Sequence, residues 1–307
     1  TISNVKISLG NYIQHKNFYL YLDDIKFNKE KIPEYDMGIF KKIFGFENFC
    51  IVKKTYEKKK KVKEYLNEAV LFTNILSKEY AHWMFEIYPS IVLEDKLMKN
   101  KNIPFLMNSS LKNIKNIKNS LKLISNNRKV IYVDNETNIN VKKLIIPEKI
   151  SNVIYDNLNT KKAKLRHLGR FNYNKFKKFT SIVVKKFGSY NQSKGKVLIL
   201  RNSLRRNYVG MEKYLSIFKK KKFQMIYPER LSFKDQIKIF MNATEIVLPG
   251  GAAVVNVIFS QKSCKITILV PKSNTIMDYF WGNFLKELKF KNYKIIRCKI
   301  HKKYENY

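Results

Sequence analysis

Arginine is scarce in this chain, and it gathers at one point. Only eight of the 61 Lys and Arg residues are Arg, and three of those eight stand within six residues of one another: Arg201, Arg205 and Arg206. A planar guanidinium can bind phosphate oxygens through two parallel hydrogen bonds. The cluster therefore predicts a phosphate-binding site, with interdomain salt bridges as the structural alternative.

A Pro-Gly-Gly turn lies further along, in the segment EIVLPGGAAVVNVIF at 245–259. The pattern predicts a strand that runs into a helix whose first turn is small and uncharged, with Gly250, Gly251 and Ala252. The backbone N–H groups and the dipole at such a helix start favour an anion. Plain strand-to-helix packing is the alternative. Asn256, one to two turns into the helix, is a candidate cap or ligand contact.

Two further places carry side chains that could do chemistry. His82 and Glu86 are four residues apart, so on a helix they share a face, and a histidine oriented by a carboxylate can act as a general base. A core or hinge histidine is the alternative. Glu229 follows a predicted strand directly, where an acidic residue can accept hydrogen bonds from ribose hydroxyls. The alternative for Glu229 is a helix-capping loop.

The elements that must position these residues are clearest in the second half of the chain. Short apolar runs alternate there with helical patterns, and Ser232 is a plausible N-cap with Asp235 at the third helical position. This alternation predicts a parallel, doubly wound sheet. The expected strands are 197–200, 223–227, 245–248, 265–270 and 294–298, and the expected helices are 211–220, 232–241, the glycine-opened helix to 259, and 275–288.

The first half shows the same alternation more weakly. Its candidate strands are 49–52, 70–75, 104–107, 129–133 and 143–146, and helices fit around 80–98 and 111–124. The polar, basic stretch 151–195 is the expected junction. The predicted architecture is α/β, with two Rossmann-like domains facing across a cleft, one at 1–165 and one at 166–307. Ligands of such sheets lie at the carboxyl ends of the strands.

The charge of the chain is strongly positive. Lys and Arg number 61 against 24 Asp and Glu, which gives +37, while 45% hydrophobic and 14% aromatic residues suffice for a large core. This composition excludes a disordered basic tail. The lysines are spread along the chain, as expected of a solvated surface. The alternative is a functional positive field for anionic lipid, a phosphate-bearing substrate, a polyanionic glycan or nucleic acid.

Other classes of protein are excluded by composition. No apolar run reaches the roughly 18 residues that a membrane-spanning helix needs. The three cysteines, Cys50, Cys264 and Cys298, are far apart and odd in number, which argues against a disulfide framework or a cysteine zinc site and favours a reducing compartment. The residues at the start of the sequence, TISNVKISLG, contain no hydrophobic signal core.

The order of these motifs resembles glycosyltransferase family 61, and specifically its bacterial capsule and lipopolysaccharide branch. The pieces are HW-x-x-E from His82, then R-x-x-x-RR from Arg201, YPE-x-LSF-x-DQ from Tyr227, and PGGAA-x-x-N-x-IF from Pro249. The resemblance spans roughly 69–298 and is best over 201–259. One departure is that many members have a His before the Gly-Ala of the helix turn, where this chain has Gly250 and Gly251.

The resemblance implies a two-Rossmann (GT-B) fold and an inverting transfer of a sugar from a nucleotide-sugar donor to a glycan or lipid-linked acceptor in surface polysaccharide biosynthesis. The chain contains no DxD motif, so we expect no metal and no cofactor, with arginines neutralising the diphosphate instead. His82 is the first choice for the base and Glu86 the second. The expected donor-binding residues are Arg201, Arg205, Arg206, Glu229, Gly250, Gly251, Ala252 and Asn256.

We expect a cytoplasmic protein, with its basic surface in peripheral contact with the anionic inner face of the membrane and with nucleic acid not favoured. Two alternatives stay open. A basic nucleic-acid-binding or polyanion-binding protein would spread Arg and aromatic residues along a continuous stripe. A non-catalytic nucleotide-sugar-binding module would share the fold but would not need His82.

Overall fold

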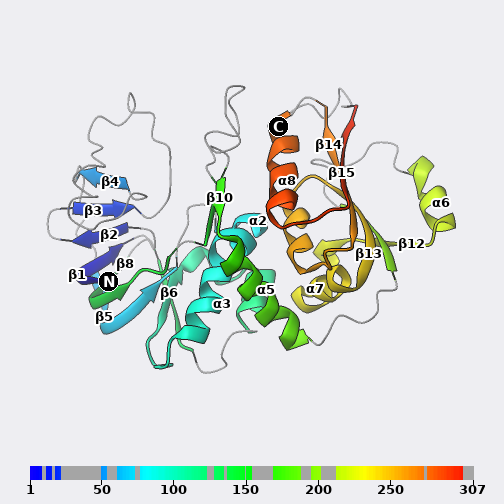
Figure 1. Ribbon diagram of the computed structural model, residues 1–307. Helices are drawn as coiled ribbons and strands as arrows, with labels where there is room; N and C mark the ends of the chain where they lie inside the picture. Colours follow the sequence, from blue (N-terminus) through cyan, green and yellow to red (C-terminus); the bar gives the residue numbers. More distant parts are fainter. Residues whose placement is uncertain are drawn as a thin grey trace. The chain divides into compact units, whose positions relative to one another are not determined.

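The computed structural model describes thirteen stretches of the chain, and they form two compact units. The first unit holds the described residues up to 153 together with 169–171, and the second holds 172–187 and all later described residues. Both units are mixed α/β structures (Figure 1). The stretches are 1–8, 12–15, 18–21, 50–53, 61–72, 77–122, 128–134, 137–148, 150–153, 169–187, 195–201, 212–272 and 275–299.

The first unit is built on an eight-stranded sheet in the order β4-β3-β2-β1-β8-β5-β6-β7. Neighbouring strands from β8 to β7 run parallel, whereas β4, β3, β2 and β1 join the sheet through antiparallel pairs. The sheet is therefore mixed, and the prediction of a plain Rossmann-like sheet in this half is only partly confirmed. Its strands are β1 (Ile2–Ser8), β2 (Tyr12–His15), β3 (Phe18–Tyr21), β4 (Cys50–Lys53), β5 (Lys61–Leu71), β6 (Phe105–Asn108), β7 (Val130–Val133) and β8 (Thr137–Ile145).

Helices follow the parallel strands of this unit. The predicted helix around 80–98 consists of three parts: α2 (Tyr80–His82), a π-helical turn η1 (Trp83–Ile87) and α3 (Tyr88–Leu97). Burial along β5 shows which part of the sheet is covered, because exposure alternates from 62 to 68 and all residues from 69 to 72 are buried. The remaining elements are η2 (Ser109–Leu111), α4 (Lys115–Leu121) and a small pair of strands, β9 (Ser151–Val153) and β10 (Gly169–Phe171).

The second unit has a five-stranded sheet in which every neighbouring pair is parallel. The order β12-β11-β13-β14-β15 corresponds to 2-1-3-4-5 along the chain, which is one of the two common doubly wound orders. The five strands predicted for this half are thus all present and pair as expected. They are β11 (Gly195–Ile199), β12 (Phe223–Ile226), β13 (Ala243–Pro249), β14 (Lys265–Pro271) and β15 (Tyr293–Cys298).

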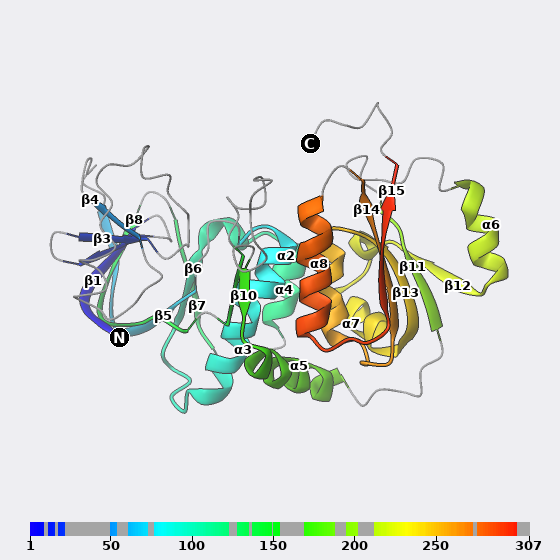
Figure 2. The ribbon, with the colours of Figure 1, turned by 45° about the horizontal axis from the view of Figure 1, so that its top comes forward.

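Helices cover both faces of this second sheet. Figures 1 and 2 show α6 (Glu212–Lys220) on one face and α7 (Phe233–Asn242) and α8 (Thr275–Glu287) on the other. The helix α5 (Tyr173–Phe187) packs against α7 and the 3₁₀ helix η6 (Ala252–Phe259). The N-cap predicted for α7 is confirmed, because the Ser232 hydroxyl oxygen accepts a hydrogen bond from the Asp235 N–H at 3.1 Å.

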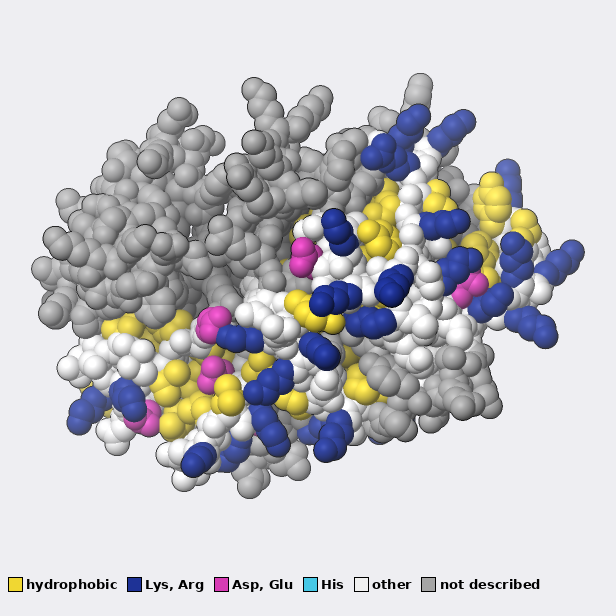
Figure 3. Space-filling view, in the orientation of Figure 1, with side chains coloured by type: hydrophobic (Ala, Val, Ile, Leu, Met, Phe, Trp, Pro, Cys, Tyr) yellow, Lys and Arg dark blue, Asp and Glu magenta, His cyan; other side chains and the backbone are white. Residues whose placement is uncertain are grey.

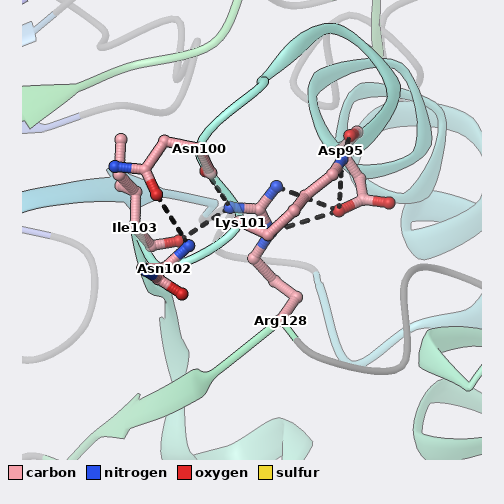
Figure 4. A network of polar contacts seen from close by, with 6 residues as sticks. All are labelled: Asp95, Asn100, Lys101, Asn102, Ile103 and Arg128. Carbon is pink, nitrogen blue, oxygen red and sulfur yellow. Dashed lines mark hydrogen bonds and ion pairs between the residues drawn. The ribbon is translucent and has the colours of Figure 1, made fainter.

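A buried arginine ties together the amino ends of two parallel strands in the first unit (Figure 4). Arg128 lies just before β7, its side chain is only 2% exposed, and its Nε donates to Asp95 Oδ1 of α3 at 3.1 Å. Its Nη1 donates to the carbonyls of Asn100 and Ile103 at 2.9 and 3.0 Å. The guanidinium also lies 4.6 Å from the ring centroid of Phe105, the first residue of β6. Several directed donors are thus used at once, which a lysine could not supply.

Removing this arginine should destabilise the fold much more than removing its neighbour. Arg128→Ala leaves the buried Asp95 without its arginine partner and removes the donor to two carbonyls, so we expect a loss of roughly 3 kcal/mol in the free energy of unfolding. Lys129→Ala is the matched control, because Lys129 is 64% exposed and pairs with Glu64 at 3.2 Å on the surface, a contact worth about 1 kcal/mol or less. Urea unfolding of both variants measures the difference. Equal losses of unfolding free energy would show that the Arg128 network does not contribute more to stability than the surface pair.

Candidate functional site

Three predicted site segments lie at one edge of the second sheet. The strands β12, β11 and β13 are neighbours and parallel, so their carboxyl ends share an edge. Glu229 follows β12, Arg201 follows β11, and Gly250 follows β13. The connection after β11 leads to β12 on one side, and the connection after β13 leads to β14 on the other. Such a reversal point is where open parallel sheets bind ligands.

Arg201 lies against the glycine turn that follows β13. A Cβ atom added to Gly251 would stand 3.1 Å from Arg201 Nη1 and 3.8 Å from its Cζ, so any other residue here would crowd the guanidinium and require it to shift. The turn thus places a guanidinium directly against the buried backbone of Gly251. Cationic side chain and peptide N–H groups at one spot are what a phosphate group needs.

Gly250 has a different task from the one expected. Its N–H donates to the carbonyl of Leu269 at 2.7 Å, so it extends the sheet and is not available to an anion. A Cβ atom at this position would stand 2.9 Å from Val270 Cγ1, so Gly250 is required for packing. The Gly250 N–H is therefore not a donor to an anion, contrary to the prediction.

The predicted helix after the turn is present, but it is a 3₁₀ helix over its whole length, from Ala252 to Phe259. Its first internal hydrogen bond runs from the Val254 N–H to the Gly251 carbonyl at 3.0 Å. The N–H groups of Ala252 and Ala253 precede that bond, as at any helix start. They stand directly after the glycine beside Arg201.

Asn256 is not placed for ligand contact. Its side chain is fully buried, and its Nδ2 donates to Gln236 Oε1 of α7 at 3.2 Å. Gln236 in turn donates from Nε2 to the Pro228 carbonyl at 2.9 Å. Pro228 begins the 3₁₀ turn η5 (Pro228–Arg230), which carries the exposed Glu229. Asn256 and Gln236 therefore position the loop of Glu229, which corrects the expectation of a cap or ligand contact.

Gln236 and Trp281 are two residues that sequence reasoning missed. Gln236 is a buried amide on the same helix face as Phe233 and Phe240, and a polar residue on an apolar face was the available signal. Trp281 of α8 is 4% exposed, and its Nε1 would lie 3.5 Å from a Cβ on Gly250. It packs beneath the glycine turn, and within the described part of the chain its N–H has no hydrogen-bond partner. Arg205 and Arg206 lie outside the described residues.

His82 and Glu86 form a tight pair in the first unit, as their spacing predicted. His82 Nδ1 and Glu86 Oε2 are 2.5 Å apart, and the two side chains are 13% and 2% exposed. Against an ionised carboxylate the Nδ1 atom must carry a proton and donate it. In the neutral imidazole the basic lone pair is then on Nε2.

The surroundings of this pair are held by hydrogen bonds within the first unit. Trp83 Nε1 donates to Ser120 Oγ of α4 at 3.0 Å, and the Tyr88 hydroxyl donates to the Ser120 carbonyl at 3.2 Å. Ser151 of β9 donates to the Phe85 carbonyl inside the π-helical turn. Single π turns within helices often occur at functional sites, and here the turn presents His82 on a firmly anchored helix.

No group of three or more His, Cys, Asp or Glu residues in the described stretches stands close enough to hold a metal ion. None of the helices described in the two units has the length and apolar character to cross a bilayer.

The second unit thus presents a doubly wound parallel sheet with an arginine and a glycine turn at its reversal point, which defines an α/β protein. The chain belongs to the Glycosyltransferase 61 family, whose model matches residues 80–267. The matched range contains both the His82 pair and the Arg201 turn. No curated protein matches the chain.

The contact between Arg201 and Gly251 can be tested by one added methyl group. Gly251→Ala should displace the guanidinium and weaken the binding of inorganic pyrophosphate about tenfold, on the scale of one charge-assisted hydrogen bond. Gly195→Ala is the control, because a Cβ there meets nothing within 4 Å. Calorimetry measures both. In an Arg201→Ala background the effect of Gly251→Ala should vanish, and persistence of the full effect would show that the glycine does not act through Arg201.

Proposed function

We propose that this glycosyltransferase is an inverting enzyme that moves a sugar from a nucleotide-sugar donor to a hydroxyl group of a glycan or lipid-linked saccharide. The observation that carries the proposal is the guanidinium of Arg201 over Gly251 at the reversal point of the parallel sheet. The bacterial capsule or lipopolysaccharide setting, the GT-B arrangement and the cytoplasmic location stay predictions that rest on the sequence resemblance.

The donor site of this proposal lies in the second unit. Arg201, Arg205 and Arg206 bind the diphosphate, together with the N–H groups at the start of η6. Glu229 accepts hydrogen bonds from the ribose hydroxyls. When the bond between the anomeric carbon and the phosphate oxygen breaks, negative charge grows on the departing nucleoside diphosphate, and fixed positive groups at that place lower the barrier.

The first unit supplies the base in this proposal. His82 Nε2 takes the proton of the acceptor hydroxyl while the acceptor oxygen forms its bond to the anomeric carbon and the diphosphate leaves with the electron pair. Glu86 keeps the imidazole in the required tautomer through Nδ1 and stabilises the imidazolium that forms. The ion pair at 2.5 Å supports this division of roles. Glu86 itself is the second choice for the base.

Charge neutralisation by arginine makes a divalent ion dispensable, so we propose transfer without metal and without a cofactor. Arg201→Ala, Arg205→Ala or Arg206→Ala should each weaken nucleoside diphosphate binding by roughly 1.5–3 kcal/mol in the presence of EDTA. Lys196→Ala is the control, because Lys196 pairs with Glu245 at 3.7 Å near the opposite end of β11. Calorimetry with the diphosphates UDP and GDP, and with the monophosphate CMP for comparison, measures the affinities. Unchanged affinity in all three arginine variants, or binding that requires Mn²⁺, would contradict the proposed donor site.

His82 distinguishes an enzyme from a binding module. His82→Ala should lower the single-turnover rate by about 10²–10⁴-fold and leave donor affinity nearly unchanged. Ser120→Ala is the control for stability, because it breaks the buried bond to Trp83 without touching the His82 pair. The rate and the melting temperature are measured on one preparation of each variant. A normal rate with a lowered melting temperature in His82→Ala would show that His82 is not the general base and that Glu86 or another residue has this role.

A further inference from the structure

Helix α6 carries apolar side chains that pack against the core and further apolar side chains that are exposed. Leu215 and Phe218 pack against the buried cluster of β11, β12 and β13. Tyr214 and Ile217, three residues apart on the adjoining side of the same helix, are 56% and 47% exposed. Only five large hydrophobic residues of the described chain are classed as exposed, and Tyr214 and Ile217 are two of them. Half of the apolar face of α6 is therefore turned outward.

Lysines border this outward apolar strip. Lys213, Ile217 and Lys220 follow one another at spacings of four and three, so they lie on one face of the helix. Lys219, Lys221 and Lys222 continue the basic run at the end of the helix, and all of these lysines are exposed. Figure 3 shows dark blue and yellow side chains side by side over α6. Glu212 is the single acidic residue of the helix.

Neither local helix physics nor composition explains both features. Lysines at the carboxyl end of a helix interact favourably with its dipole, which accounts for part of the basic run. The dipole does not account for an exposed tyrosine and isoleucine between the lysines. An amphipathic helix with a lysine-rich border and an exposed aromatic and aliphatic pair is instead typical of helices that lie in a membrane interface.

We infer that α6 is a docking element for an anionic lipid bilayer: Tyr214 and Ile217 insert at the headgroup level, and Lys213, Lys219, Lys220, Lys221 and Lys222 bind the lipid phosphates. A lipid surface fits better than a protein partner, because two side chains are far below the roughly 800 Å² per partner that a stable protein interface buries. A short apolar insertion assisted by several lysines is sufficient for a bilayer.

The inference goes beyond the proposed reaction and does not depend on it. It nevertheless bears on the donor site, because α6 is the first described element after Arg201. The segment 202–211 between them carries Arg205 and Arg206. A bilayer that holds α6 would thus hold one end of the segment that supplies two of the proposed phosphate ligands.

Co-sedimentation with vesicles of phosphatidylcholine and phosphatidylglycerol at 7:3 tests this docking, with the full chain and in the absence of any substrate. The wild type should bind these vesicles and not vesicles of phosphatidylcholine alone. Tyr214→Ser/Ile217→Ser removes apolar area and leaves the charge, and should weaken binding about tenfold or more. Lys219→Gln/Lys220→Gln/Lys221→Gln should weaken binding about a hundredfold, since each lysine near an anionic surface contributes roughly a fivefold factor.

The matched control removes the same charge from another exposed helix. Lys177→Gln/Lys178→Gln/Lys185→Gln on α5 changes three exposed lysines, and it should weaken binding only a few-fold. Circular dichroism verifies that each variant is folded. Three results would overturn the inference: no binding of the wild type, full binding of Tyr214→Ser/Ile217→Ser, or equal losses in the α5 and α6 lysine variants. Because the assay uses no nucleotide, its failure leaves the proposed transfer untouched.

Discussion

The reversal of winding at β11 is the constraint on which the donor side of this protein depends. The connection after β11 leads to β12 on one side of it, and the connection after β13 leads to β14 on the other side. These two connections diverge and leave the carboxyl ends of both strands accessible. The first residues beyond those ends are the ones that can meet a ligand. Arg201 and the Gly250-Gly251 turn occupy these positions, and the missing side chain at Gly251 lets the guanidinium approach to contact distance.

The two ends of the parallel strands serve different purposes in the first unit. At the amino ends of β6 and β7, Arg128 satisfies a carboxylate and two carbonyls from the interior. After β5 the chain leads to a helix with a π turn, which holds the His82 pair. The buried arginine network thus lies at the amino ends of these strands, and the irregular π turn follows a carboxyl end.

Local patterns in the sequence predicted the elements whose signals are local. The strands of the second unit are continuous apolar runs, the Ser232 cap precedes its helix directly, and the His82 pair needs a separation of only four residues. The strands β1, β2 and β3 were missed because they are short or alternate in polarity and pair antiparallel. The burial of Asn256 could not be predicted either, since its partner Gln236 is twenty residues away and on another helix.

Two arginines of this chain lie where a planar guanidinium is needed, whereas Arg230 and Arg297 are exposed like the lysines. Arg128 lies in the interior and Arg201 over a backbone turn, where a planar group that keeps its charge can direct several donors at once. Lysines take positions at the surface, such as Lys289 over the ring of Tyr173, where a flexible stem covers apolar surface and the ammonium meets water. The net charge of +37 is therefore weak evidence by itself. What carries information is a lysine run beside exposed apolar side chains, as on α6, or an arginine where lysine would have been the default.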